Sequence, residues 1–112
     1  MIIFRKKIES QNLENIKKQL LELGMNPSTD GIWFWTIAIN FVRKDKNLAI
    51  KMTDMYKKIA KYCKTDMAKV ERNMRTSLAP IRDVVGKTYN YNGKIDNKTF
   101  LSLCNYINID WK

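Results

Sequence analysis

The chain has 112 residues, a length that suits one compact domain with a single hydrophobic core. Its apolar fraction of 45% argues against wholesale disorder, whereas its formal net charge of +10 is unusually high. Residues 43–82 contain twelve Lys or Arg and four Asp or Glu, a net of +8, which leaves nine minus seven, or +2, for the rest. This concentration favours a polyanionic partner, either a nucleic acid or an anionic membrane face.

Several protein classes are disfavoured by what the sequence lacks. No apolar segment follows the basic residues near the start, and the most apolar run, 31–42, is shorter than the roughly 20 residues of a membrane-spanning helix. Histidine is absent and Cys63 and Cys104 have no ligand-like spacing, so we expect a cytoplasmic protein with buried, reduced thiols, no metal and no cofactor. Without a glycine-rich phosphate loop or recognisable paired carboxylates, we expect no enzymatic activity.

The first helix is expected over residues 12–23. Its apolar side chains recur at the three-and-four spacing of one buried helical face: Leu13, Ile16, Leu20 and Leu23. Gly24 is the expected C-terminal stop. Pro27 prevents helix in the following turn, and Thr29 or Asp30 is available to cap the next helix.

The second helix is expected over residues 31–43 and is apolar on nearly all sides. Only Thr36, Asn40 and Arg43 form a polar stripe, a pattern typical of a central helix buried by several neighbours. We therefore expect Trp33 and Trp35 to lie in the core or in a self-association surface. A cofactor pocket or a membrane-surface anchor is disfavoured, because no basic amphipathic face accompanies the tryptophans.

A helix-turn-helix is predicted at about 48–79. Its first helix should begin near Asn47 or Leu48 and end at Tyr62 or Cys63, and residues 64–65 should form the turn. We expect Thr65 to cap the second helix and Asp66 to lie in its first turn. Pro80 should end or kink that helix.

The remaining chain is predicted as a short helix at 81–85, a polar loop at 86–96 and a last helix. The loop contains Tyr89 and Tyr91 and could form a small hairpin or wing. Asp96 or Asn97 should cap the last helix, which is expected to reach Ile107. The fold class is therefore all-α, a single compact domain of five to six helices.

Helical geometry divides the predicted helix at 65–79 into two faces. One face is apolar and should pack on the preceding helices: Met67, Val70, Met74 and Leu78. Residues on or beside the other face are candidates for reading bases: Lys69, Glu71, Arg72, Arg75 and Thr76. Glu71 could accept from cytosine or pair with a nearby lysine, and both possibilities stay open.

Phosphate contacts are expected from the supporting helix and the turn: Lys57, Lys58, Lys61, Lys64 and Thr65. For any single lysine here, a purely solvated surface position is an equal alternative. Lys64 also stands where many helix-turn-helix motifs have glycine.

The chain resembles the C-terminal DNA-binding effector domain of the sporulation-initiation response regulator of endospore-forming bacteria. The similarity is carried by Leu23-Gly24, Gly31, Ala38-Ile39, Tyr56, Ile59-Ala60-Lys61, Thr65, Val70-Glu71-Arg72 and Arg75, and more faintly by residues 100–107. It implies about six helices and a recognition helix that enters the major groove of short, often tandem DNA boxes. It also implies that Glu71 and Arg72 face bases and that Arg75 faces a base or a phosphate.

Three departures from the family pattern affect what the resemblance implies. Thr76 replaces the usual histidine, so the resemblance implies no target preference at that position. Pro80 changes the end of the recognition helix, where the family continues towards its self-association surface. Only about a dozen residues precede the matching region, so we expect no receiver domain and no phosphorelay input.

The leading hypothesis is a sequence-specific double-stranded DNA-binding transcriptional regulator that acts as a homodimer or as tandem copies. The alternative is a helical protein-interaction module, an antagonist or adaptor of another regulator, whose contact surface is the helix with Trp33 and Trp35. RNA remains a possible polyanion, but the aromatic residues lie on apolar faces and form no exposed stacking platform.

Overall fold

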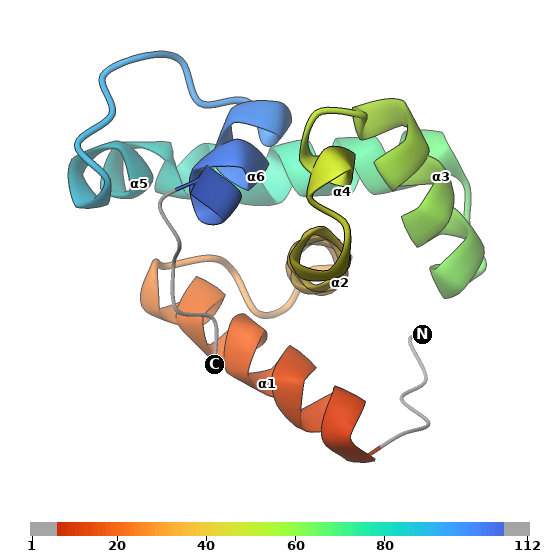
Figure 1. Cartoon of the computed structure of the whole chain (residues 1–112). Helices are drawn as coiled ribbons and strands as arrows, with labels where there is room; N and C mark the ends of the chain where they lie inside the picture. The colour runs from red at the N-terminus through yellow and green to blue at the C-terminus, as the bar shows by residue number, and fades with distance from the viewer. Residues whose placement is uncertain (1–6, 107–112) are drawn as a thin grey trace.

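The structure is a computed structural model that describes residues 7–106 and, within them, the side chains of residues 13–104. This part of the chain forms six α-helices and two short 3₁₀ helices and contains no strand, which confirms the predicted all-α class (Figure 1). The elements are α1 (Lys7–Glu22), α2 (Asp30–Lys44), η1 (Lys46–Ala49), α3 (Met52–Cys63), α4 (Met67–Leu78), η2 (Ala79–Ile81), α5 (Arg82–Thr88) and α6 (Asn97–Tyr106).

The first helix starts earlier than predicted but ends where the sequence indicated. Leu13, Ile16 and Leu20 are fully buried, as their spacing predicted, whereas Leu23 is only partly buried. Gly24 follows the helix with a φ of +102°, a backbone conformation that glycine adopts without steric cost. The amide of Met25 donates to the carbonyl of Leu20 at 3.1 Å and closes the helix end.

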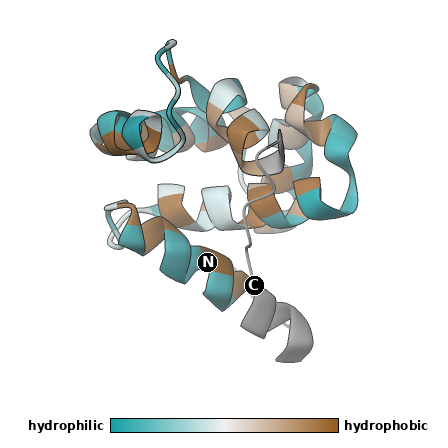
Figure 2. Ribbon diagram, turned by 60° about the vertical axis from the view of Figure 1, so that its left-hand side comes forward, coloured by the Kyte–Doolittle hydropathy of each residue, from teal (hydrophilic) through white to brown (hydrophobic). Residues whose placement is uncertain are grey.

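The second helix is the centre of the molecule, as predicted. Figure 1 shows α2 nearly end-on, with α1 below it and α3, α4 and α6 around its other sides. In the predicted polar stripe Arg43 is exposed, whereas Thr36 and Asn40 are buried. The Thr36 hydroxyl donates to the Ile32 carbonyl at 2.7 Å, so its burial leaves no unpaired hydroxyl. Figure 2 shows hydrophobic segments where the helices face one another.

The predicted start of the third helix was wrong. Residues 46–49 form the 3₁₀ helix η1, and α3 begins only at Met52. The cause is local: the Asp45 carboxylate accepts from the Asn47 amide at 3.1 Å and stabilises a tight turn instead of an α-helical one. Lys51 then takes a φ of −111° and a ψ of 69°, outside the helical region, which separates η1 from α3.

The break near Pro80 is confirmed, although its neighbours differ from the prediction. Helix α4 ends at Leu78, and Pro80 lies inside η2. Helix α5 then covers 82–88, later and longer than the predicted 81–85, so Gly86 is helical. The loop therefore spans 89–96 and contains no strand of the expected hairpin. Ile107, the predicted end of the last helix, lies outside the described residues.

Asp96, one of the two predicted caps of α6, accepts from the Thr99 amide at 2.8 Å. This hydrogen bond lowers the pKa of Asp96, because it favours the ionised carboxylate. Cys63 and Cys104 are buried and unbridged, and burial raises the pKa of the Cys63 thiol to about 11. Within residues 7–106, no cluster of side chains suits a metal ion, and no helix is long and apolar enough to cross a membrane.

Candidate nucleic-acid interface

Helices α3 and α4 form the predicted helix-turn-helix, and a lysine occupies the left-handed position in the turn between them. Lys64 has a φ of 56° and a ψ of 50°, the left-handed conformation for which glycine is usual. The Thr65 amide donates back to the Ala60 carbonyl at 2.9 Å, which ends α3. A lysine can therefore occupy the position where many such motifs carry glycine.

The residue that caps α4 differs from the prediction. Asp66, and not Thr65, is the N-cap, because its carboxylate accepts from the Lys69 amide at 2.8 Å. A negative charge at this end also suits the helix dipole. The start of α4 is thus fixed by one side-chain hydrogen bond.

One face of α4 is fastened to α2. The indole Nε1 of Trp35 donates to the Met74 carbonyl at 2.9 Å, and the Trp35 ring meets Phe100 edge-on at 4.9 Å between ring centroids. Near the start of α2, Gly31 lies directly against Ser77, whose hydroxyl is 3.3 Å from that of Thr29. The apolar face of α4 is buried as predicted at Val70, Met74 and Leu78, which have no exposed surface, whereas Met67 is only partly buried.

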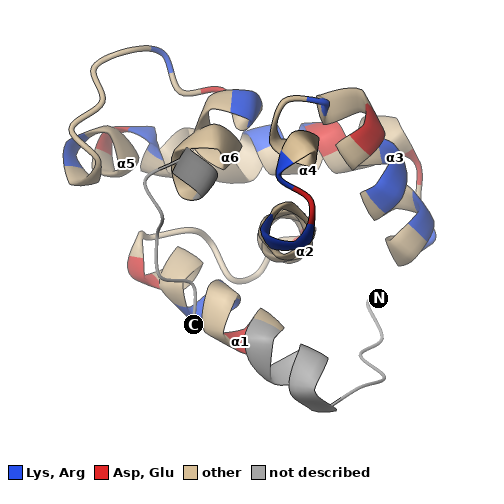
Figure 3. Ribbon diagram, in the orientation of Figure 1, with Lys and Arg blue, Asp and Glu red and all other residues tan. Residues whose placement is uncertain are grey.

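The opposite face of α4 is open to solvent within the described part of the chain. Lys69, Arg72, Arg75 and Thr76 are exposed and Glu71 is half-buried. At about 100° per residue, Arg72 and Thr76 lie near the middle of this face, whereas Arg75 lies towards one edge. Figure 3 shows cationic segments along α3, α4 and α5. The arginine-bearing side of the helix is therefore accessible in the monomer.

Glu71 has a partner that the sequence interpretation did not name. Its carboxylate lies 3.7 Å from Nε of Arg75, one helical turn further on, whereas the sequence interpretation left open cytosine or a nearby lysine. The two side chains are 36% and 57% exposed respectively, so water screens the pair and it contributes little to stability. Both groups therefore remain accessible to a ligand.

The first residue of α6 joins α3 to α4 beside this ion pair. The side-chain Nδ2 of Asn97 donates to the Tyr56 hydroxyl at 3.1 Å and lies 3.5 Å from the Glu71 carbonyl oxygen. Burial raises the pKa of Tyr56, and the Asn97 hydrogen bond opposes that shift. Tyr56 and Asn97 were missed as residues that support the site, because no spacing in the sequence indicates a contact across 41 positions.

The predicted phosphate-binding residues do not all lie on one side of α3. Lys57, Lys58, Lys61 and Lys64 are exposed and Thr65 is half-buried. Lys58 is about 100° around the helix from Lys57, and its Nζ lies 5.1 Å from the centroid of the Phe41 ring on α2. Lys57 and Lys61 are separated by only about 40° around the helix. They form the more coherent cationic strip.

The comparison with protein families finds one described as Sporulation initiation factor Spo0A C terminal, which matches residues 16–106. The match runs from the middle of α1 to the end of α6 and includes the whole helix-turn-helix. No curated protein and no solved structure matches the chain.

Proposed function

Because the chain belongs to the family of Spo0A C-terminal domains, which are DNA-binding domains of transcription regulators, we propose that it reads a specific double-stranded sequence with α4 in the major groove. The observation that supports this proposal is the solvent-exposed face of α4 with Arg72 at its middle. A major groove about 12 Å wide admits a helix whose outward side chains are unobstructed.

The exposed face assigns distinct roles to its residues. Arg72 and Lys69 are donors suited to guanine O6 and N7, and Thr76 offers a hydroxyl and a methyl group to the neighbouring base. Glu71 and Arg75 lie on the edge near α6, where the carboxylate can accept from cytosine N4 and the guanidinium can reach a base or a phosphate. Each good bidentate pair contributes about 1–3 kcal/mol of discrimination against the wrong base.

Lysines of α3 and the turn supply affinity without reading sequence in this proposal. Lys57, Lys61 and Lys64 would contact phosphates, with the Thr65 hydroxyl as a further donor. Lys58 is directed towards Phe41 and would contribute less. Each phosphate neutralised should add about 0.9 to the steepness with which log K falls with log salt.

Selection from a randomised duplex pool at near-physiological salt tests the proposal. We expect a shared motif, and fluorescence anisotropy on that motif should separate two kinds of variant. Arg72→Ala should lose preference at one or two base positions by about 1–3 kcal/mol. Lys61→Ala should weaken all sequences alike and reduce the salt slope by about 0.9. Lys18→Ala is the matched control, because Lys18 is exposed on α1, across α2 from the helix-turn-helix (Figure 1).

A pool that yields no shared motif would refute sequence-specific reading. Duplexes with one and two copies of the motif test the expected dimeric or tandem mode, because cooperative binding requires the second copy. The protein-interaction alternative keeps only part of its proposed contact surface. Trp35 is fully buried, and Trp33 is half-buried with Nζ of Lys17 4.0 Å from its ring centroid.

A further inference from the structure

An open pocket of about 630 Å³ lies between α5 and the loop at 89–96. Three of its lining residues are cationic, Arg82, Lys87 and Lys94, and one is acidic, Asp83, so its side chains carry three minus one, or +2. Uncharged donors complete much of the wall: Asn90, Tyr91, Asn92 and the backbone of Gly93. A concave wall of this composition favours an anion with several acceptor oxygens.

The loop that forms the outer wall is tied to α5 at two points. Nε of Arg82 donates to the Ile95 carbonyl at 2.9 Å, and the Tyr91 amide donates to the Gly86 carbonyl at 2.8 Å. A Cβ on Gly86 would lie only 3.0 Å from the Tyr91 carbonyl oxygen, so glycine permits this close approach. The bond from Arg82 uses Nε alone, and the two terminal nitrogens of its guanidinium are not part of it.

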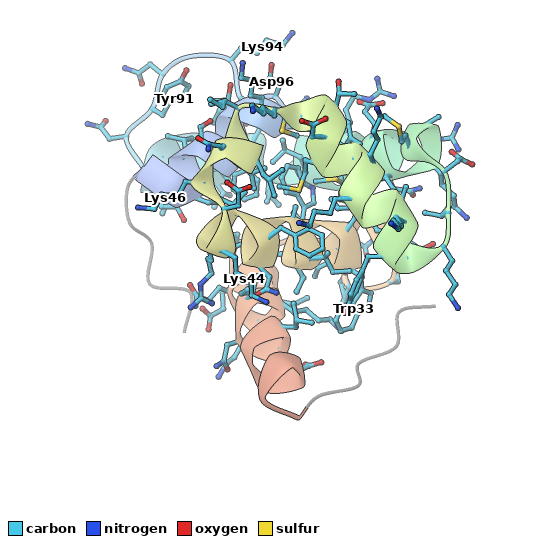
Figure 4. The ribbon with its side chains drawn as sticks, turned by 45° about the vertical axis from the view of Figure 1, so that its right-hand side comes forward. Trp33, Lys44, Lys46, Tyr91, Lys94 and Asp96 are labelled. Atoms are coloured by element: carbon cyan, nitrogen blue, oxygen red, sulfur yellow. The ribbon has the colours of Figure 1, made fainter. Side chains whose placement is uncertain are left out.

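The two elements that line the pocket both adjoin α4. Helix α5 follows α4 through η2, and Figure 1 shows α5 lying roughly in line beyond the end of α4. The loop then returns to Asn97, which lies against the Glu71 carbonyl in the first half of α4. The end of the loop therefore lies near the edge of α4 that carries Arg75, and the pocket lies between this loop and α5. Figure 4 shows Tyr91 and Lys94 projecting from this loop, well away from Trp33 on the other side of the molecule.

We propose that this pocket binds one phosphate of the DNA backbone beside the base pairs that α4 contacts, with Arg82, Lys87 and Lys94 as its donors. This inference rests on the proposed function and extends the interface beyond the helix-turn-helix. A phosphate fixed past the end of α4 would restrict how far the helix can slide or tilt in the groove. Contacts of this kind set the register of a protein on DNA without reading sequence themselves.

The test pairs a charge removed from the protein with a charge removed from the DNA. The protein variant is Lys87→Ala/Lys94→Ala, in which both altered side chains are exposed, so an unchanged thermal melt should confirm that it is folded. The DNA series is the selected motif with a single neutral methylphosphonate at each successive flanking position. We expect one position at which wild-type protein loses affinity and the variant does not, and a salt slope lower by about 0.9 for the variant.

Failure of this inference is distinguishable from failure of the proposed function. If the wild type binds its motif and the variant shows the same salt slope and the same methylphosphonate profile, the phosphate site is refuted while base reading stands. If no motif exists, both proposals fail. A second experiment tests whether the pocket instead takes free phosphate. Inorganic phosphate is titrated against the DNA-free protein, and the backbone amide chemical shifts of residues 82–95 are measured. Saturable shifts together with an unchanged DNA profile would mean that the pocket takes a free phosphate ligand, which also overturns the backbone assignment.

Discussion

Gly31→Ala should destabilise the domain although alanine is the better helix former. A Cβ at this position would overlap Oγ of Ser77 and would lie 2.6 Å from the Ser77 Cβ and 2.5 Å from the Asn73 carbonyl oxygen. A hydroxyl can rotate away, but a carbonyl in the middle of α4 cannot move alone. Helix α2 would have to move away from α4 at its N-terminal end.

Two opposing contributions set the size of the stability change in Gly31→Ala. Replacing glycine by alanine inside a helix stabilises by up to about 1 kcal/mol. Forcing extra volume into a well-packed contact costs about 1–3 kcal/mol, and occasionally more. Contacts this short with backbone belong at the upper end, so we expect a net loss of about 2 kcal/mol. For a domain of this size that corresponds to a fall in Tm of roughly 8 °C or somewhat more.

Urea denaturation of the wild type, Gly31→Ala, Ser77→Gly and the double variant measures this contact. Removing the Ser77 side chain relieves part of the overlap, so the double variant should lose less than the sum of the two single changes. The Asn73 carbonyl contact remains, so rescue should be incomplete. Gly31→Ala as stable as the wild type, or more stable, would refute the idea that α2 and α4 meet here without room for one methyl group.

Three further changes test the elements that hold the helix-turn-helix. Trp35→Phe should lose about 1–3 kcal/mol by urea denaturation, because it deletes the hydrogen bond to Met74 and leaves a small void, and an unchanged midpoint would contradict that role. Asp66→Ala should lower the free energy of unfolding by about 1 kcal/mol, and Asp66→Asn should lower it much less, because asparagine also caps helices. Equal losses for the two variants would contradict a capping role for this side chain. The pKa of Asp96 is lowered by its hydrogen bond with the Thr99 amide, so its stabilising effect is present above the ordinary carboxyl pKa near 3.8 and is lost as pH falls through the lower folded value. The stability difference between the wild type and Asp96→Ala should therefore shrink on acidification, and a difference independent of pH would exclude this linkage.

Features governed by the chain's own neighbours could be predicted from the sequence. The buried stripe of α1 follows from the 3.6-residue period, and the nearly uniform apolarity of α2 indicated a central helix. Gly24 and Pro80 act within one turn of their own positions, so their effects needed no knowledge of the fold. The outward face of α4 followed in the same way, because burying Val70 and Met74 fixes which side faces solvent.

Competing short-range hydrogen bonds explain two boundaries that were wrong. Asp45 and Asp66 each accept an amide hydrogen bond from a residue two or three positions on. At the first site this produced a 3₁₀ turn where a helix was expected, and at the second it moved the cap from Thr65 to Asp66. Several neighbouring polar residues could have served as caps, and only the path of the chain decides between them.

The setting of α4 depends on contacts that no local pattern contains. On one edge Gly31 and Trp35 fix its distance from α2, and on the other Asn97, hydrogen-bonded to Tyr56, lies against its first half. None of these side chains lies on the exposed face, yet together they determine how far that face is rotated. If α4 reads bases as we propose, target preference should depend also on these supporting residues, because base contacts tolerate little displacement. On that proposal, a sequence comparison restricted to the outward positions of α4 would miss these supporting residues.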